Sequence, residues 1–374
     1  MFVSNPLLLS REAYVPGLSK EYVSKTYGIP IGEIAKLGSA ENPLGPSLKA
    51  CQAIQAAMPR LEVYPEWTSR VLRERIAEEY GFDSGQVICG AGETEIISWI
   101  IRVFSAPGDR VQMYAPAFPM YHIAAENEGR APRFVGMGDE LEFRLEDFLE
   151  QLAERPRIVF LTNPHSPTSR LLPEEHIRRV CEAAGDDLVV LDEAYIHFTQ
   201  TEGALHLVRE YPNLIALRTF SKAFGLGGLR VGFGVATREV IAPLLQLKPT
   251  WNLGQLQLAG ASAALDDKAH VSRTVAEVAA NRAYVVDKLT SMNRFRVIGD
   301  PRANFLLLRI EDPSLDSKRA FLELLKQGVI VKDCSLSFVG LGDRHLRIDI
   351  GLRKDMDRLI RALSAIDTTA GPRS

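Results

Sequence analysis

The chain has 374 residues, of which 46% are hydrophobic and 24% are charged, and its formal net charge is −3. Disordered chains are poor in apolar residues and strongly charged, so this balance predicts a globular protein with a substantial core. The weak negative charge gives no electrostatic reason to expect a nucleic acid or an anionic membrane as a partner.

The length predicts two domains, since one domain usually holds about 100–200 residues. We expect an N-terminal arm (residues 1–45) that joins the smaller domain, a large domain (46–265) and a small C-terminal domain (266–374). In the large domain, short β-branched runs alternate with helical patterns, which predicts an α/β fold with a mostly parallel mixed sheet flanked by helices. The expected strands, in chain order, are 87–89, 110–114, 158–162, 188–191, 214–217 and 231–235.

Two helices are expected from apolar periodicity. Between the first two strands, apolar residues from 96 to 104 recur at helical spacing and predict a helix with one apolar face. In the last hundred residues a long helix (271–292) precedes strands at 304–310 and 346–350, which predicts a smaller α+β domain.

The four cysteines are widely separated, which is typical of a protein from a reducing compartment. The N-terminal segment has no cationic region before its short leucine run, unlike a signal peptide, and no stretch of about 18 apolar residues occurs. We therefore expect a soluble cytoplasmic protein. The spacing of histidine, cysteine and aspartate predicts no metal site.

The first candidate site follows the strand at 87–89. Gly90 and Gly92 form a turn before a helix, where backbone N–H groups and the helix dipole attract an anion. An ordinary strand-to-helix turn explains the same pattern about equally well. The next strand ends without the acidic residue that would hold a ribose, which favours a bare phosphate over a dinucleotide.

The second candidate is Asp192, directly after an apolar strand. Ligands of open α/β sheets bind at the carboxyl ends of strands, so this acid would face a cleft. A helix N-cap is the alternative interpretation, because aspartate is common there.

The third candidate is Lys222, which stands among small, apolar and hydroxyl residues. Partial desolvation lowers the pKa of a lysine and frees its amine to attack a carbonyl. Arg230, further along a glycine-rich stretch, supplies a rigid cation for a phosphate. A solvated loop lysine is the ordinary alternative, which the dense glycines disfavour.

Together the three candidates describe one cofactor. An amine that forms an imine, a carboxylate for a pyridinium nitrogen and a glycine, hydroxyl and arginine cradle for phosphate are what pyridoxal 5′-phosphate (PLP) requires. Each motif alone is weak evidence for this cofactor, but the three motifs in this order along the chain are strong evidence for it.

Segments along nearly the whole chain match one family. They are 14–17 (Tyr-Val-Pro-Gly), 41–46 (Glu-Asn-Pro-Leu-Gly-Pro), 64–66 (Tyr-Pro-Glu), 192–195 (Asp-Glu-Ala-Tyr), 218–226 (Arg-Thr-Phe-Ser-Lys-Ala-Phe-Gly-Leu) and 346–348 (Leu-Arg-Ile). In these segments the chain resembles the histidinol-phosphate aminotransferases, which are fold type I pyridoxal-phosphate enzymes. The resemblance implies a homodimer with shared active sites that uses a small-molecule amino donor and a 2-oxo acid.

The resemblance also implies roles for single residues. Lys222 would form the internal aldimine with the cofactor, Asp192 would pair with the pyridine nitrogen, and Tyr195 would bond the phenolic oxygen. The other expected cofactor contacts are Gly92, Glu93, Thr94, Phe118 (stacked on the ring), Ser166, Thr219, Ser221, Arg230 and Tyr64 (toward the partner subunit's cofactor). The expected substrate contacts are Tyr14, Asn42, Lys332 and Arg347.

Three positions depart from the family pattern. Ser166 replaces an asparagine that donates to the phenolic oxygen, and its shorter side chain leaves Tyr195, His165 or a water to help. Lys332 replaces an arginine and offers a point charge in place of a bidentate fork. Ala40 stands where the family has asparagine.

Three functions stay open at this point. The first is transamination, with Lys222 as the base that moves a proton from the substrate's Cα. The second is decarboxylation of an O-phosphoamino acid, because residues 92–95 and 302–305 are similar to threonine-phosphate decarboxylases. The third is a cofactor-binding homologue without catalytic activity.

Overall fold

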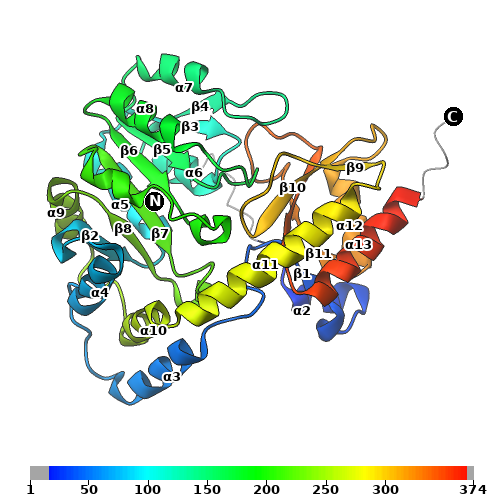
Figure 1. Cartoon of the computed structure of the whole chain (residues 1–374), viewed down its shortest axis with the longest axis horizontal. Coiled ribbons are helices and arrows are strands. Elements are labelled where there is room, and N and C mark those ends of the chain that lie inside the picture. Colours follow the sequence, from blue (N-terminus) through cyan, green and yellow to red (C-terminus); the bar gives the residue numbers. More distant parts are fainter. Residues whose placement is uncertain (1–16, 369–374) are drawn as a thin grey trace, which may run out of the picture.

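A computed structural model describes residues 17–368 of the chain (Figure 1). Its main feature is a seven-stranded sheet in the order β2-β8-β7-β6-β5-β3-β4. The strands, in that order, are Val87–Gly90, Gly232–Val235, Leu214–Thr219, Leu188–Asp192, Ile158–Thr162, Arg110–Ala115 and Ala131–Gly136. Only β8 runs antiparallel to its neighbours, so the expected mostly parallel mixed sheet is confirmed.

Strand β4 was not expected from the sequence. It lies at the edge of the sheet, pairs with β3 alone and contains a proline and an arginine. An edge strand tolerates proline and needs no continuous apolar run, so it lacks the pattern of the buried strands.

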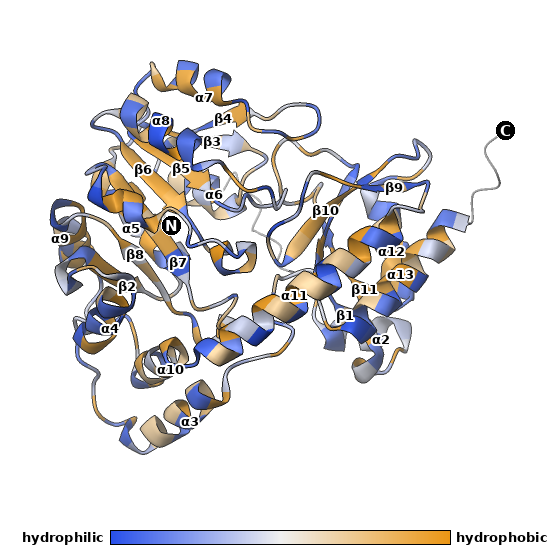
Figure 2. Ribbon diagram, in the orientation of Figure 1, coloured by the Kyte–Doolittle hydropathy of each residue, from blue (hydrophilic) through white to orange (hydrophobic). Residues whose placement is uncertain are grey.

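Helices cover both faces of this sheet because the strands bury alternate residues on opposite sides. Ile158 and Phe160 of β5 pack with one set of helices, whereas Val159 and Leu161 pack with another. The first set is α5 (Glu93–Phe104), α6 (Pro119–Asn127) and α9 (Arg238–Leu247). The second set is α4 (Arg70–Tyr80), α7 (Leu145–Leu152), α8 (Glu174–Ala184) and α10 (Gln255–Leu265). Figure 2 shows the resulting layers, with apolar strands between helices that are polar on their outer sides.

A second, antiparallel sheet has the order β12-β13-β10-β9. Its strands are Lys332–Asp333, His345–Asp349, Phe305–Ile310 and Phe295–Val297. Helices α11 (Lys268–Leu289), α12 (Ser317–Lys326) and α13 (Arg353–Thr368) pack beside it. The N-terminal segment joins this part through β1 (Ala35–Lys36), which pairs in parallel with β11 (Val329–Ile330).

The long helix α11 runs between the two sheets (Figure 1). It begins before the expected position 271 because Asp267 caps it, with a side-chain oxygen that accepts from the backbone N–H of His270 at 3.3 Å. The expected bounds 271–292 therefore lie three residues beyond the observed ones at each end.

The remaining described elements are short. They are α2 (Lys20–Tyr27), η1 (Ile31–Glu33), α3 (Leu48–Ala57), η2 (Met58–Arg60), η3 (Ser84–Gln86), η4 (Ile196–Thr199), η5 (Leu205–Arg209) and η6 (Gly227–Leu229). In residues 17–368 no helix is long and apolar enough to cross a membrane. The boundaries expected for the arm and the two domains stay a prediction.

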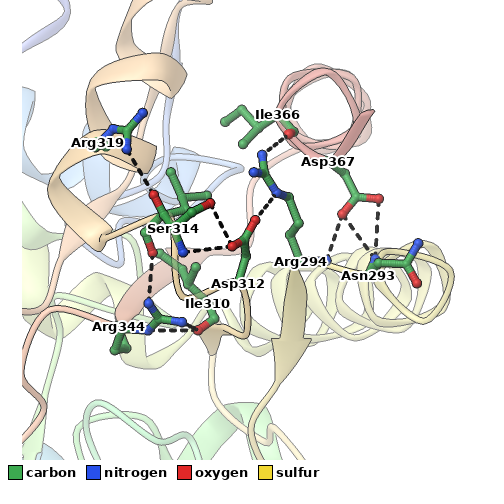
Figure 3. Close-up of polar contacts among 10 residues, drawn as sticks. Asn293, Arg294, Ile310, Asp312, Ser314, Arg319, Arg344, Ile366 and Asp367 are labelled. Carbon is green, nitrogen blue, oxygen red and sulfur yellow. Dashed lines mark hydrogen bonds and ion pairs between the residues drawn. The ribbon is translucent and has the colours of Figure 1, made fainter. Parts of the chain in front are cut away.

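Partly buried polar contacts link α13 to the second sheet (Figure 3). Asp367 of α13 accepts a hydrogen bond from the backbone N–H of Arg294 at 2.8 Å, and Arg294 donates through Nε to Asp312 at 2.6 Å. Arg344 donates to the carbonyl oxygen of Ile310 at 2.8 Å. The C-terminal helix is thus tied to Arg294, directly before β9, which in turn binds Asp312 after β10.

Candidate active site

Two neighbouring strands end at one point and carry polar residues of the site. Asp192 is the last residue of β6, Thr219 is the last residue of β7, and Lys222 follows in the next loop. The carboxyl ends of parallel strands are where open α/β sheets bind ligands. The sheet therefore brings the second and third sequence candidates together.

Asp192 is 2% exposed, and both of its oxygens are hydrogen-bonded. Tyr121 on α6 donates its hydroxyl to Oδ2 at 2.5 Å, and the backbone N–H of Ala194 donates to Oδ1 at 2.9 Å. Burial raises the pKa of Asp192, and the hydrogen bond from Tyr121 opposes that shift. A cation beside this carboxylate would offset the effect of burial and lower its pKa, so the site favours a positively charged partner.

The sequence interpretation missed Tyr121. Its hydroxyl also lies 2.9 Å from Thr162 Oγ1 at the end of β5, so it links two strand ends. The available signal was its spacing from Phe118, which precedes it by one helical turn on α6 and therefore shares its side of that helix. The two rings meet edge to face, with centroids 5.5 Å apart.

The glycine turn after β2 lies against Arg230. Gly92 has a φ of +80°, and a Cβ atom there would lie 2.4 Å from Arg230 Nη2. Gly232 is equally required, because its Cβ would lie 2.4 Å from the backbone nitrogen of Glu93. The turn therefore lets an arginine approach the N-terminus of α5, where the N–H groups of Glu93 and Thr94 begin the helix.

Hydroxyl groups complete this anion cradle. Ser221 Oγ accepts from Arg230 Nη1 at 3.3 Å and from Thr219 Oγ1 at 3.0 Å. Glu95 holds the turn by accepting from the backbone N–H of Ala91 at 2.6 Å. The arrangement offers cationic and N–H donors to one small anion.

Glu93 lies beside the same cradle with Oε2 buried and without a protein hydrogen bond. Burial raises the pKa of Glu93 well above its usual range, and the neighbouring charge of Asp192 adds to the shift. The two carboxyl groups disfavour each other's ionisation in the absence of a shared cation.

Lys222 faces the N-terminal segment. Its Nζ donates to the carbonyl oxygens of Ser39 at 3.4 Å and Ala40 at 3.3 Å. Burial lowers the pKa of Lys222, and the charge of Arg347 lowers it further. The lysine therefore loses its proton more readily than a solvated one, as nucleophilic attack requires.

Asn42 holds the lysine segment rather than lying free. Its Nδ2 donates to the carbonyl oxygen of Ala223 at 2.9 Å and to Thr274 Oγ1 at 3.2 Å, and its Oδ1 accepts from the backbone N–H of Leu44 at 2.9 Å. These contacts support a role for Asn42 in positioning the segment that carries Lys222, in addition to its expected contact with the substrate.

Tyr195 lies beside the lysine. Lys222 Nζ is 5.2 Å from the centre of its ring, and the ring packs edge to face on Phe305 with centroids 4.9 Å apart. Burial raises the pKa of Tyr195, so its hydroxyl keeps its proton and can donate a hydrogen bond.

Ser166 and His165 are both buried after β5. His165 Nδ1 lies 2.8 Å from Thr168 Oγ1, and burial lowers the pKa of this histidine to about 3. Ser166 Oγ is buried with no hydrogen-bond partner among the described residues. A buried hydroxyl without a partner costs free energy, so this atom is available to a bound group.

The two expected substrate cations come from adjacent strands of the second sheet. Lys332 of β12 is the register partner of Arg347 of β13, and both are less than 10% exposed. The Arg347 guanidinium lies 4.9 Å from the centre of the Phe305 ring and donates to the carbonyl oxygen of Gly38 at 3.4 Å. Burial lowers the pKa of Lys332, and the charge of Arg347 lowers it further.

One expected contact lies apart from this cluster. Tyr64 is 74% exposed and stacks on Trp251 with ring centroids 4.6 Å apart. Tyr14 lies outside the described residues. Within the described ranges, no group of three or more histidine, cysteine or acidic side chains could hold a metal ion.

Comparison with known proteins agrees with this geometry. Residues 33–363 match the family model for class I and II aminotransferases, and the chain belongs to that family. Within it, the chain belongs with the histidinol-phosphate aminotransferases. It is 35% identical over 94% of both chains to the histidinol-phosphate aminotransferase of Methanocaldococcus jannaschii, and 35% identical to that of Anaeromyxobacter sp., covering 96% of this chain and 98% of the relative.

Solved structures share the fold. The histidinol-phosphate aminotransferase of Sinorhizobium meliloti, in complex with PLP, is 22% identical, covers 98% of each chain and has a TM-score of 0.87. The L-threonine-O-3-phosphate decarboxylase of Porphyromonas gingivalis is also 22% identical and has a TM-score of 0.79, covering 89% of this chain and 99% of its own. At these identities the likeness shows the fold type I architecture alone.

The chain is a PLP-dependent aminotransferase, an enzyme that acts on small-molecule amino and keto substrates. The residues present fit the cofactor, because Arg230 packs against Gly92 at the N-terminus of α5, where a cation and backbone N–H groups suit a phosphate, and the unpartnered Ser166 hydroxyl suits a polar ring substituent. When bound, PLP supplies an aldehyde for the substrate's amine and a ring that accepts electrons from its Cα.

Proposed function

We propose that the amino donor is histidinol phosphate and that a 2-oxo acid is the acceptor. The observation that carries this proposal is the buried cation pair Lys332 and Arg347, where a phosphate or a carboxylate would bind. The curated relatives bear the name of that donor. Decarboxylation is supported by the similarity of residues 92–95 and 302–305 and by a structural neighbour at 22% identity, which is weaker support than that for transamination.

We assign the roles of the site residues as part of the same proposal. Lys222 attaches the resting cofactor and, once displaced by the substrate's amine, moves the proton from the substrate's Cα. Asp192 keeps a proton on the ring nitrogen, and Tyr195 and Ser166 donate to the phenolic oxygen. The cofactor's phosphate is held by Gly92, Glu93, Thr94, Thr219, Ser221 and Arg230, and its ring is covered by Phe118.

A donor screen tests the reaction and the substrate together. Histidinol phosphate, phosphothreonine and aromatic amino acids are each supplied with 2-oxoglutarate, and keto product and carbon dioxide are measured separately. We expect keto product from histidinol phosphate and no carbon dioxide. Release of carbon dioxide from phosphothreonine without a 2-oxo acid would instead identify a decarboxylase, and a protein that turns over no donor would be a non-catalytic homologue.

The lysine assignment has its own control pair. Lys222→Ala should abolish multiple turnover, whereas Lys288→Ala, at an exposed lysine of α11, should leave it unchanged. Retained turnover in the Lys222 variant would show that another group moves the proton.

We also propose a homodimer with shared active sites. Tyr64 and Trp251 stack at the surface, and other large apolar side chains gather on α3, η2 and the loop after them. These exposed neighbours are Leu48, Met58, Leu61, Val63 and Trp67. Monomers rarely expose a large apolar patch, so this surface supports an interface through which Tyr64 reaches the partner's cofactor.

Subunit mixing tests the shared site. Tyr64→Ala and Lys222→Ala should each be nearly inactive, and a mixed dimer should regain activity because one of its two sites is intact. The control is Leu336→Ala, which removes an equally exposed apolar side chain elsewhere and should leave activity unchanged. Sedimentation gives the subunit number, and a monomer or an absence of complementation would contradict the proposal.

We further propose a cytoplasmic location. All four cysteines are free, and three of them are buried, as is usual for proteins that fold in a reducing compartment. Fractionation of cells that produce the protein tests the location.

A further inference from the structure

The loop after β5 is joined to the second sheet through one serine. Ser169 is completely buried, and its Oγ accepts hydrogen bonds from the backbone N–H groups of Arg302 at 2.9 Å and Ala303 at 2.7 Å. Its carbonyl oxygen also accepts from the N–H of Arg302, at 2.8 Å. Residues 302 and 303 lie just before β10. These bonds therefore connect the loop that follows a strand of the first sheet to the start of a strand of the second.

The backbone at this serine is strained. Ser169 has a φ of +62°, in the left-handed region that glycine adopts easily and serine does not. Such a conformation persists where the surrounding contacts outweigh its cost, and the two bonds that Oγ accepts are contacts of this kind. Without the hydroxyl, the backbone N–H of Ala303 would lose its acceptor in a buried place. The side chain therefore has a use that glycine could not supply.

Hydrogen bonds inside the loop tie Ser166 to Ser169. The backbone N–H of Ser169 donates to the carbonyl oxygen of His165 at 2.7 Å, and the N–H of His165 donates to that of Arg170 at 2.7 Å. Thr168 Oγ1 lies 2.8 Å from His165 Nδ1. Residues 165–170 thus form a closed turn that contains the unpartnered Ser166 hydroxyl. Because the turn is bonded at both ends, a displacement of Ser169 also displaces Ser166.

The segment that binds Ser169 also contacts the surroundings of Lys222. Asn304, next to Ala303, donates through Nδ2 to the carbonyl oxygen of Ala40 at 3.1 Å. Lys222 Nζ donates to the same oxygen at 3.3 Å. Residues 302–304 therefore connect the loop that carries Ser166 to the oxygen that binds the lysine.

We propose that Ser169 is a positioning residue that holds the Ser166 hydroxyl where it can donate to the phenolic oxygen of the cofactor. The inference rests on the role proposed for Ser166. A donated hydrogen bond favours negative charge on that oxygen, so it lowers the pKa at which the visible absorption of the bound cofactor changes. A displaced Ser166 hydroxyl loses this bond, and the pKa then rises.

A double-mutant cycle at the two serines tests the proposal, with the absorbance of the bound cofactor measured against pH. Ser166→Ala removes the donor and should raise the pKa of this absorption by about one unit, the equivalent of one hydrogen bond. Ser169→Gly suits the backbone, removes the acceptor and should raise the pKa by about half a unit or more. In the Ser166→Ala background it should add nothing, because the hydroxyl that Ser169 positions is absent.

Two further variants separate the hydroxyl from the backbone. Ser169→Ala removes the acceptor but keeps the Cβ atom, so it should raise the pKa at least as far as Ser169→Gly. A rise with glycine alone would show that backbone freedom is the cause and would overturn the proposal. Ser69→Gly is the matched control, because Ser69 is 3% exposed, has a φ of +55° and forms no side-chain cap for α4. It should leave the pKa unchanged.

The outcomes also separate this inference from the role of Ser166. An unchanged pKa in Ser166→Ala would mean that Ser166 is not the donor, and both proposals would fall. A rise in Ser166→Ala without one in Ser169→Gly would overturn the positioning role alone. Additive rises in the double variant, or an equal rise in Ser69→Gly, would also overturn it.

Discussion

At the scale of the residue, the site depends on buried polar groups with few partners. His165 is 2% exposed, and burial lowers its pKa to about 3 from the ordinary 6.5. Between those pH values the histidine stays neutral in the folded chain but binds a proton in the unfolded chain. The unfolded state then binds more protons, so stability falls as the pH falls.

We therefore expect His165 to make the protein acid-sensitive. Its contribution is fully present above pH 6.5 and declines by about 1.4 kcal/mol per pH unit below it, or about 2 kcal/mol between pH 6.5 and pH 5. Urea unfolding at pH 7.5 and pH 5 should show a smaller loss for His165→Asn than for the natural chain. The control is His206→Gln at an exposed histidine, and equal losses in all three proteins would contradict the assignment.

Tyr121 is the residue that sequence reasoning missed and that the structure places on Asp192. Tyr121→Phe removes the hydroxyl that donates to this carboxylate and should lower kcat about 10–100-fold, as expected for a hydrogen bond to a charged group. Because that hydrogen bond lowers the pKa of Asp192, its loss should move the acid limb of the pH profile to higher pH. Tyr114→Phe, whose hydroxyl bonds only weakly to the carbonyl oxygen of Arg144 at 3.4 Å, should leave the profile in place.

At the scale of the element, strand β2, the glycine turn and helix α5 form one unit. The helix N-terminus supplies N–H groups, and Gly92 lets Arg230 approach them. The sequence predicted this unit because glycines between a strand and a helix are a local pattern. The chemistry of the cofactor and the family resemblance assigned Arg230 to the same phosphate, and the structure adds that this arginine packs directly against Gly92.

The Gly92→Ala variant tests whether the close approach of Arg230 to Gly92 is needed for PLP binding, apart from the backbone strain that a positive φ imposes on alanine. An added Cβ would collide with the Arg230 guanidinium and displace it, so PLP affinity should fall at least tenfold in a fluorescence titration. Gly28→Ala is the matched control, because Gly28 has a φ of +71° with no atom within 4 Å of the added Cβ. It should lose about 1 kcal/mol of stability and keep its PLP affinity. Unchanged PLP affinity in both variants would show that the Gly92–Arg230 approach does not hold the phosphate.

At the scale of the whole molecule, ion pairs link the two sheets. Glu140, in the loop between β4 and α7, lies 2.7 Å from Arg296 of β9 and 3.1 Å from Arg309 of β10. These arginines hold the pKa of Glu140 down to about 2, so the pairs persist at every ordinary pH. The contact bridges the part that carries Lys222 and the part that carries Arg347.

Glu140→Gln should loosen that bridge without disturbing either core. Exposed pairs are worth about 1 kcal/mol or less, so the loss should be small at low salt and vanish at about 0.5 M salt. Hydrogen exchange should rise in residues 137–142 and in β9. Glu154→Gln, which breaks pairs with Arg110 and Arg133 inside the first sheet, should leave exchange in β9 unchanged. Faster exchange in β9 for both variants would mean that general destabilisation, not the bridge, is the cause.

The sequence by itself determined the sheet class, most of its strands and the group Asp192, Lys222 and Arg230, because each follows a local pattern of burial or of chemistry. Only the tertiary structure decided which distant groups meet. Tyr121 reaches Asp192 across 71 positions, and Ala40 reaches Asp349 across 309. No local pattern encodes such contacts, since they arise where separate strands and helices end at one point in space. The carboxylate of Asp349 beside Arg347 is therefore a property of the fold, and the sequence alone showed only the two cations, Lys332 and Arg347.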